Sequence, residues 1–157
     1  MGRKPASPGE TVAFLLSQLG FRSSAEFAAR LEPLGVDPVH VGMLRIIAAA
    51  EGPSQQALSS SLGIPASRMV ALVDDLERKG LVERRVNASD RRARALHLTA
   101  KGRRVAEQVR TVGLAHEAAV CAPLDDAERD QLLGLLRRVA DALGIQREVH
   151  PALTRRA

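Results

Sequence analysis

Apolar residues recur at helical spacing along most of the 157-residue chain. Steps of three and four between apolar positions indicate amphipathic helices, and we expect them over residues 10–31, 38–50, 54–62, 65–80, 100–120 and 125–143. Several helix starts also carry capping signals. Asp37 precedes a proline, and Asp125 stands three residues before Glu128, as in a capping box. Ser54 and Thr99 have the position of hydroxyl caps for the third and fifth helices.

A different pattern occupies residues 82–99, which read VERRVNASDRRARALHLT. Apolar residues there alternate with polar ones, at Val82 and Val86 and again at Leu96 and Leu98. This period of two indicates two strands joined by a turn at SDRR. The segment also carries five arginines that a hairpin does not need in order to fold: Arg84, Arg85, Arg91, Arg92 and Arg94.

The first helix and the last two carry apolar seams of the coiled-coil type. In the last helix the seam consists of Leu132, Leu136, Val139 and Leu143. A small monomer has difficulty in burying seams at both chain ends as well as a compact middle. We therefore expect a homodimer. The alternative is that the seams pack only on each other within one chain.

The middle of the chain reads as two helices joined at Gly63 and followed by the basic hairpin. This order is that of a winged helix-turn-helix. We therefore expect a mainly α fold with a small β-hairpin wing. The whole chain, 1–157, would be one domain, with dimerisation helices over 10–31 and 100–143 and a DNA-binding lobe over 37–99.

Positive charge is concentrated in one segment. Residues 78–110 contain 11 Lys and Arg against three Asp and Glu, a net charge of +8, whereas the remainder of the chain is −3. Such a concentration is expected of a surface that binds a polyanion; the alternative is a solvated face of a basic protein. Aromatic residues make up only 2% of the chain, which disfavours RNA recognition, because bases stack on aromatic side chains there.

The second helix of the motif can enter a DNA major groove with its first residues against base edges. Arg68 suits bidentate bonds to guanine, whereas the acids later in this helix would repel phosphate, so only its first two turns are expected to insert. The predicted DNA-binding residues come from this helix, the start of the helix before it and the hairpin: Ser54, Gln55, Ser67, Arg68, Val70, Ala71, Arg84, Arg85, Asp90, Arg91, Arg92 and Arg94.

Residues 62–105 resemble the multiple-antibiotic-resistance regulator (MarR) family of bacterial transcription factors. The resemblance lies in the phrase LERKGLVERR, in Asp90-Arg91-Arg92 as the DxR motif of the wing, and in LTAKG at the start of the next helix. It implies a homodimeric regulator, more often a repressor than an activator, on a pseudo-palindromic operator. It also implies that Arg92 enters the minor groove, that Asp90 orients the wing arginines, and that Arg84 supports the strand–helix junction or meets phosphate.

The chain departs from the family pattern at two places in the recognition helix. Val70 and Ala71 stand where the family often has a polar pair, so base reading there is expected to be apolar. Pro65 replaces the usual hydroxyl cap, which removes one capping bond.

The resemblance also implies a small, often anionic aromatic effector between the dimer helices and the DNA-binding lobe. The candidate contacts are His40, Arg45 and His116, although each is alternatively a structural residue. Cys121 is the only cysteine. We expect it to be buried and inert rather than redox-active.

Nothing in the sequence suggests catalysis. The four histidines lack metal-ligand spacing, and no phosphate-binding glycine loop or nucleophile motif occurs. We expect no enzyme activity, metal or cofactor. The N-terminus does not resemble a signal peptide and no apolar run is long enough to span a bilayer, so we expect a cytoplasmic protein. The alternative function is a winged helix that contacts another protein without binding specific DNA.

Overall fold

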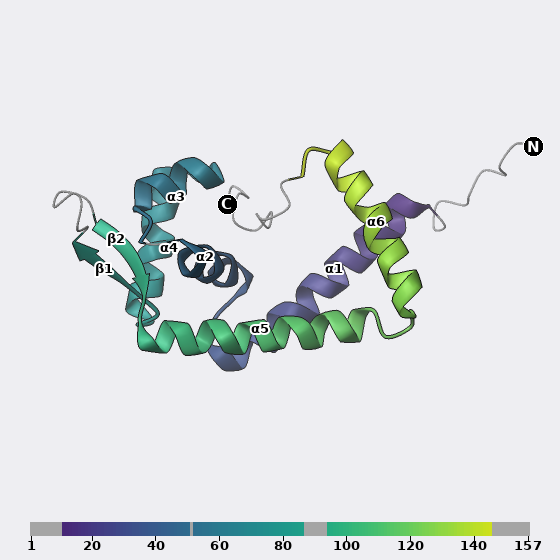
Figure 1. The fold of residues 1–157 in the computed structure, drawn as a ribbon, viewed down its shortest axis with the longest axis horizontal. Helices are drawn as coiled ribbons and strands as arrows, with labels where there is room; N and C mark the ends of the chain where they lie inside the picture. The colour runs from purple at the N-terminus through teal and green to yellow at the C-terminus, as the bar shows by residue number, and fades with distance from the viewer. Residues whose placement is uncertain (1–10, 51, 87–93, 146–157) are drawn as a thin grey trace, which may run out of the picture.

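A computed structural model describes residues 11–50, 52–86 and 94–145 of the chain (Figure 1). These residues form the mainly α architecture with one antiparallel hairpin that the sequence predicts. The elements are α1 (Val12–Leu31), the 3₁₀ helix η2 (Glu32–Leu34), α2 (Pro38–Ala49), α3 (Gln55–Leu62), α4 (Ala66–Arg78), β1 (Val82–Val86), β2 (Arg94–Leu98), α5 (Ala100–Val120) and α6 (Asp126–Ala142).

The predicted capping residues are confirmed. The Asp37 carboxylate accepts from the backbone N–H groups at the start of α2, and the Thr99 hydroxyl accepts from Gly102 in α5. Asp125 and Glu128 form the reciprocal capping box of α6. Pro65 gives α4 no side-chain cap, as expected. These starts are predictable because each depends on residues within one turn of the helix.

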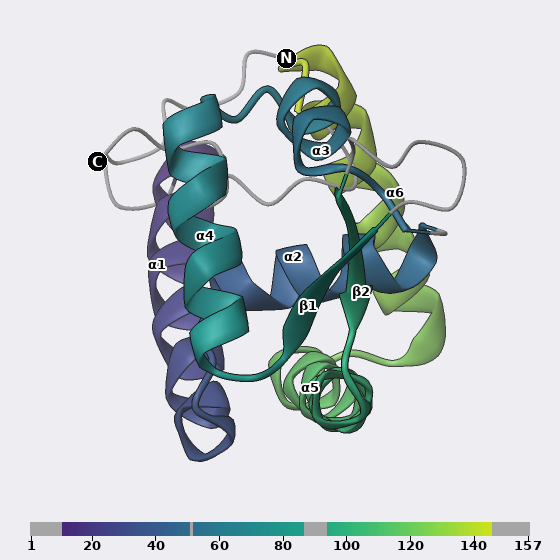
Figure 2. The same cartoon turned by 90° about the vertical axis from the view of Figure 1, so that its left-hand side faces the viewer.

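The core lies in the lobe formed by α2, α3, α4, the hairpin and the first half of α5. Figure 2 shows α4 and the hairpin side by side at this end of the molecule. The apolar spacing of α4 predicts a stripe of Met69, Leu72, Val73 and Leu76, and the structure buries Met69, Val73 and Leu76. Leu72, the fourth, is only partly buried.

The buried face of α2 differs from the prediction. The apolar spacing of this helix predicts a buried stripe of Val41, Leu44, Ile47 and Ala48, but Val41 is half-buried and Ala48 is exposed. His40 and Met43 are buried instead. Leu44 and Ile47 are buried as predicted, so two of the four predicted positions are confirmed and two are wrong. The physical reason is that His40 has a partner on α4, so a polar side chain occupies a position that periodicity assigns to the surface.

The hairpin pairs Val82 with Leu98 and Arg84 with Leu96. A bridge between Ser54 and Ala95 fastens β2 to the start of α3. The Thr99 hydroxyl donates to the carbonyl of Gly80 at 2.7 Å, which fixes the start of α5 under the hairpin. The hairpin is thus held at its base by both neighbouring helices.

The two terminal helices lie at the other end of the molecule. α5 runs the length of the structure, and α1 and α6 lie near its far end (Figure 1). α6 buries none of its side chains, and its apolar residues Leu132, Leu136 and Val139 remain exposed. Packing among the described residues therefore leaves these seams exposed, contrary to the alternative that they pack only on each other within one chain. Within the described ranges, no helix combines the length and the apolar character needed to cross a membrane.

Candidate nucleic-acid interface and adjoining cavity

The outer face of α4 presents the residues that the sequence assigned to base reading. Because α4 turns its apolar stripe inward, Ser67 and Ala71 are exposed and Val70 is 42% exposed. Arg68 is half-buried on the same first two turns. The face therefore carries accessible side chains of mixed polarity. Such side chains can contact the base edges in a major groove.

The acids of α4 are largely paired with a cation from the hairpin. Arg84 binds the carboxylate of Glu77 through Nη1 and that of Asp74 through Nη2, the latter at 2.7 Å. Its Nη2 also donates to the side-chain oxygen of Gln55 at 3.1 Å. This Arg84 cluster (Gln55, Asp74, Glu77 and Arg84) joins α3, α4 and β1. It also offsets the negative charge that would otherwise oppose DNA near α4.

The other described residues of the predicted DNA-binding set have different surroundings. Ser54 caps α3 by accepting from the backbone of Ala57 at 3.0 Å. Arg85 pairs with Glu83 on the exposed side of β1, at 2.5 Å. Arg94 is exposed at the start of β2. Asp90, Arg91 and Arg92 lie outside the described residues, so the assignments made for the wing tip stay predictions.

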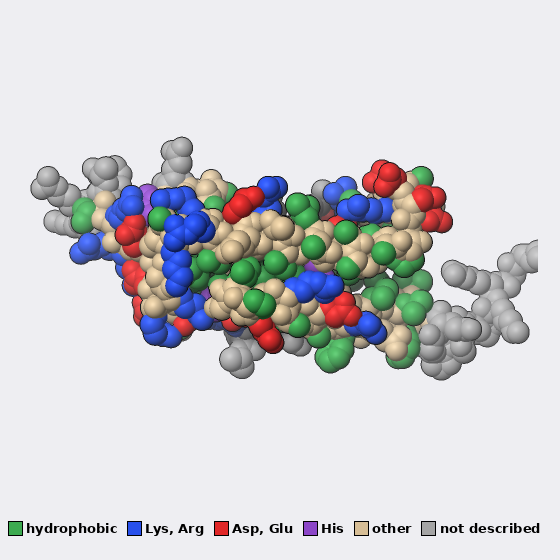
Figure 3. Space-filling model, turned by 90° about the horizontal axis from the view of Figure 1, so that it is seen from below, with side chains coloured by type: hydrophobic (Ala, Val, Ile, Leu, Met, Phe, Trp, Pro, Cys, Tyr) green, Lys and Arg blue, Asp and Glu red, His purple; other side chains and the backbone are tan. Residues whose placement is uncertain are grey.

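Surface charge follows the same division of the molecule. Lys and Arg side chains gather at the hairpin end, whereas exposed apolar side chains extend toward the end formed by α1 and α6 (Figure 3). One end thus has the properties of a polyanion-binding surface, and the other those of a protein–protein interface.

A cavity of about 650 Å³ lies between these two ends, bounded by α1, α2, β2 and α5. Its walls are mostly apolar, and three guanidinium groups and one carboxylate line it: Arg45, Arg103, Arg110 and Glu107. Arg110 donates to Glu107 at 2.8 Å, and this hydrogen bond lowers the pKa of the Glu107 carboxyl and raises that of Arg110. With one carboxylate against three arginines, the lining carries a net positive charge.

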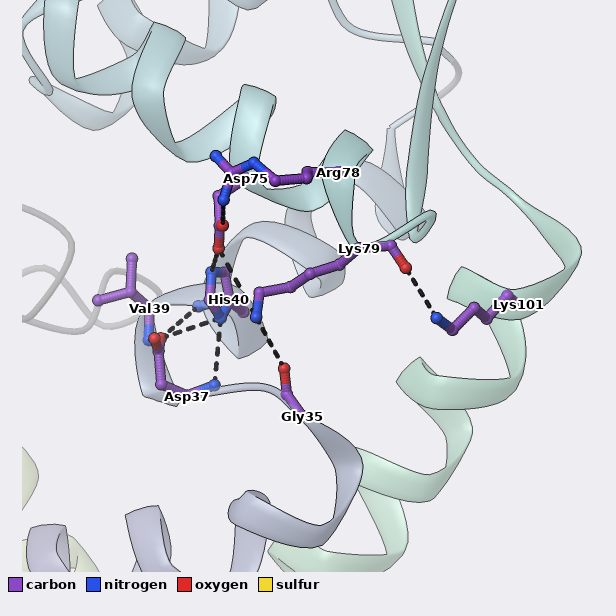
Figure 4. Close-up of polar contacts among 8 residues, drawn as sticks. All are labelled: Gly35, Asp37, Val39, His40, Asp75, Arg78, Lys79 and Lys101. Carbon is purple, nitrogen blue, oxygen red and sulfur yellow. Dashed lines mark hydrogen bonds and ion pairs between the residues drawn. The ribbon is translucent and has the colours of Figure 1, made fainter.

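Only one of the three residues predicted to contact an effector lines this cavity. Arg45 does so from α2. His116 instead joins α5 to α1, where its Nε2 lies 2.9 Å from the Ser23 hydroxyl and its Nδ1 lies 3.3 Å from Nη1 of Arg30. His40 is buried at the start of α2, where it contacts Asp75 of α4 (Figure 4). The structure thus separates residues that the sequence grouped together.

Cys121 is half-buried rather than buried, at the C-terminal end of α5. Partial burial, together with the neighbouring Glu117 carboxylate, raises the pKa of its thiol. A raised pKa leaves less thiolate, which is the reactive form, so the surroundings favour the expected inertness. Among the described residues, no group of three His, Cys, Asp or Glu side chains has an arrangement that would hold a metal ion.

Comparison with known proteins agrees with this geometry. The family model described as MarR family matches residues 34–93, which span the lobe from η2 into the hairpin. A Thauera aromatica protein, described as the proposed transcriptional regulatory protein for the hcr operon, is 38% identical over 105 residues. Over residues 34–93 the chain is thus similar to the MarR family of transcriptional regulators. The match to the Thauera protein covers 67% of this chain and 63% of that protein, so it spans less than two thirds of the relative's length.

Solved MarR-type structures share the fold over most of the chain. The transcriptional repressor CouR, bound to a 23-mer DNA duplex, is 29% identical with a TM-score of 0.73, covering 89% of this chain and 99% of that one. CouR from Rhodococcus jostii RHA1 bound to p-coumaroyl-CoA is 27% identical with a TM-score of 0.70, covering 87% and 96%. The MarR family consists of transcriptional regulators rather than enzymes.

Sequence reasoning missed two features of this chain. Arg103 and Arg110 line the cavity, but the sequence shows them only as part of a general basic segment. The contact of His40 with Asp75 joins residues 35 positions apart. A histidine at the third position of a helix that an Asp caps is a signal for a local capping bond, but no local pattern indicates a partner on another helix.

Proposed function

We propose that this protein is a DNA-binding transcriptional regulator, and specifically a repressor, that acts as a homodimer on a pseudo-palindromic operator. One observation carries the proposal: the first two turns of α4 are accessible beside an arginine-bearing hairpin, while Asp74 and Glu77 of the same helix are paired with Arg84. A helix of this kind can enter a major groove, because part of its negative charge is offset within the protein. Its proposed DNA target makes a cytoplasmic location the expected one.

The roles of the residues follow from their chemistry. Arg68 can form two parallel hydrogen bonds to guanine, and Val70 can contact a thymine methyl group. Arg94 and Arg85, on the exposed parts of the strands, are suited to phosphate contacts that set the register without reading sequence. Arg84 serves mainly to hold the lobe together, because its guanidinium already has three partners.

The homodimer is supported by the uncovered seams. Large apolar residues of α1 and α6 are exposed in the single chain, among them Leu15, Leu19, Leu132 and Leu136. A second copy would bury these seams and place two copies of α4 on one side. Two such helices reach successive major grooves when they lie roughly 34 Å apart.

The cavity supports an amphipathic anion as the effector. Its apolar walls suit an aromatic or acyl group, and Arg45, Arg103 and Arg110 suit carboxylate or phosphate oxygens. CouR, which is 27% identical, has been solved with p-coumaroyl-CoA, a molecule with both parts. An occupant of this cavity would touch α2 and α5, which also support the DNA-binding lobe.

The proposal is tested by selecting duplexes with the full-length protein from a random-sequence pool. We expect a pseudo-palindrome to be enriched. Arg68→Ala should weaken binding by about 1–3 kcal/mol at one base position. Arg94→Ala should weaken binding to all sequences and lower the slope of log affinity against log salt concentration by about 1. Failure to enrich any sequence at physiological salt would instead favour the protein-contact function.

The effector is tested on the same protein–duplex complex. We expect p-coumaroyl-CoA to release the duplex, and free coenzyme A and p-coumarate to do so only at much higher concentration, because each supplies one part of the amphipathic ligand. Arg45→Ala should weaken the response to p-coumaroyl-CoA without altering DNA affinity in its absence. Release that is equal for wild type and Arg45→Ala would argue against this cavity as the effector site.

A further inference from the structure

We infer that His40 is a positioning residue for DNA recognition: its hydrogen bond to Asp75 sets the direction in which α4 points its base-reading end. The inference rests on the proposed function and adds to it a residue that touches no DNA. His40 lies at the start of α2 and is only 5% exposed. It therefore acts on the DNA surface only through the helix that it contacts.

The geometry assigns the two ring nitrogens of His40 to different helices (Figure 4). The backbone N–H of Asp37 donates to Nδ1 at 3.2 Å, so Nδ1 is an acceptor and closes the capping box of α2. The ring proton is then on Nε2, which donates to Oδ2 of Asp75 at 2.7 Å. One buried imidazole thus links the first turn of α2 to the third turn of α4.

Asp75 is the centre of a wider set of contacts at this end of α4. Its Oδ1 accepts from Arg78 at 2.6 Å. Lys79, which follows Arg78, donates from Nζ to the carbonyl of Gly35 at 3.1 Å. The backbone carbonyl of Lys79 accepts from Nζ of Lys101 in α5 at 2.8 Å (Figure 4). The C-terminal end of α4 is therefore anchored to α2, to the turn before α2 and to α5.

The other end of α4 is held differently. Pro65 provides no side-chain cap, and the residues there, Ser67 and Val70, face outward. Their direction therefore depends on the anchored end, on the Arg84 cluster and on the apolar packing of Met69 and Val73. At the turn before α4, Ser59 and Ile64 also hydrogen-bond to each other. Apolar packing is not directional, whereas a charge-assisted hydrogen bond fixes an angle as well as a distance. His40 supplies such a bond from a rigid, buried position.

A small change in direction is sufficient to matter. Ser67 lies eight residues before Asp75, which is about 12 Å along the axis at about 1.5 Å per residue. A tilt of about 10° at the anchored end would move Ser67 by about 2 Å, whereas groups that recognise a ligand must stay within roughly 0.5 Å of their productive geometry. Phosphate contacts through long arginine side chains tolerate such a shift far better than base contacts do.

The test uses three variants of the full-length protein that separate the two bonds of His40. His40→Asn keeps an acceptor near the Asp37 N–H but is too short to reach Asp75. His40→Gln can reach Asp75 with its amide N–H and so serves as the rescue. Asp75→Ala breaks the same bond from the half-exposed side of α4, in case a change at the buried position prevents folding. Arg78→Ala is the matched control, because it removes a contact of Asp75 without removing the link between α2 and α4.

The measurement is the ratio of affinities for the duplex that the wild type selects and for a random duplex of equal length. We expect this ratio to fall roughly tenfold in His40→Asn and Asp75→Ala, about what the weakening of one base contact implies. Affinity for random duplex should stay near the wild-type value, and His40→Gln and Arg78→Ala should keep the wild-type ratio.

Two outcomes would overturn the inference. If His40→Asn and Asp75→Ala keep the wild-type ratio, the bond does not set the direction of α4. If both duplexes lose affinity equally, in step with a lower unfolding temperature, His40 is only a stabilising residue. Both outcomes differ from failure of the proposed function, in which the wild type itself selects no sequence.

Discussion

At the scale of single residues, the arginines of the hairpin differ in the number and exposure of their partners within the protein. Arg84 and its partner Glu77 are both less than a third exposed, and Arg84 has two further partners in Asp74 and Gln55. Among the described residues Arg85 has only Glu83 as a partner, and both of those side chains are largely exposed. The sequence placed both arginines in one predicted DNA-binding set, because spacing along a strand does not show which carboxylates the other elements bring to each face.

This difference predicts unequal effects on stability. Arg84→Ala removes a cation shared by two carboxylates, so we expect the free energy of unfolding to fall by about 1–3 kcal/mol. Arg85→Ala removes an exposed pair and should cost about 0–1 kcal/mol. Urea unfolding of both variants without DNA measures the difference. Equal losses for the two variants would show that the Arg84 cluster does not hold the lobe together.

At the scale of elements, helix starts were predictable but the orientation of helix faces was less so. The capping residues Ser54, Thr99 and Asp125 act on neighbours within three residues, so local sequence contains the whole signal. The buried face of α2 depends on Asp75, which belongs to another helix. The cavity is less predictable still, because its lining comes from four elements spread between α1 and α5.

Two glycines of α5 illustrate the same contrast and provide a matched test. Gly102 is buried, and a Cβ there would overlap the carbonyl oxygen of Leu81. Gly113 has nothing within 4 Å of a Cβ built on it. We expect Gly102→Ala to destabilise the protein by about 1–3 kcal/mol through overpacking, and Gly113→Ala to stabilise it by about 0.5–1 kcal/mol through helix propensity.

Thermal unfolding of the two glycine variants gives the comparison. A Gly102→Ala protein as stable as the wild type would mean that α5 can move away from the base of the hairpin without cost. In that case the close approach of Gly102 to Leu81 would not explain why a glycine ends the LTAKG motif at the start of α5.

At the scale of the whole molecule, the two ends have opposite surfaces. The hairpin end is basic and buries its apolar core residues, whereas α1 and α6 expose large apolar residues along most of their length. The sequence predicted the seams from periodicity alone. It left open whether they pack within the chain, because that depends on where α5 places α6 relative to α1. In the structure α6 begins at the far end of α5 and buries no side chain, and the proposed homodimer would cover it.

The expected partner is a second copy of the chain. In sedimentation experiments the wild type should have twice the chain mass of 16.8 kDa. Replacing both Leu132 and Leu136 by Glu places two charges in the seam, and we expect monomers, because an unpaired charge is costly to bury. Arg137→Glu, outside that seam, is the control and should leave the dimer intact.

DNA binding should change with assembly, because a monomer presents one α4 to an operator with two half-sites. We expect the double variant to lose most of its affinity for the selected palindrome, while a duplex with a single half-site is bound about equally weakly by both proteins. If the double variant stays dimeric, the interface lies elsewhere on the molecule. If it becomes monomeric yet keeps its affinity for the palindrome, recognition does not need two lobes.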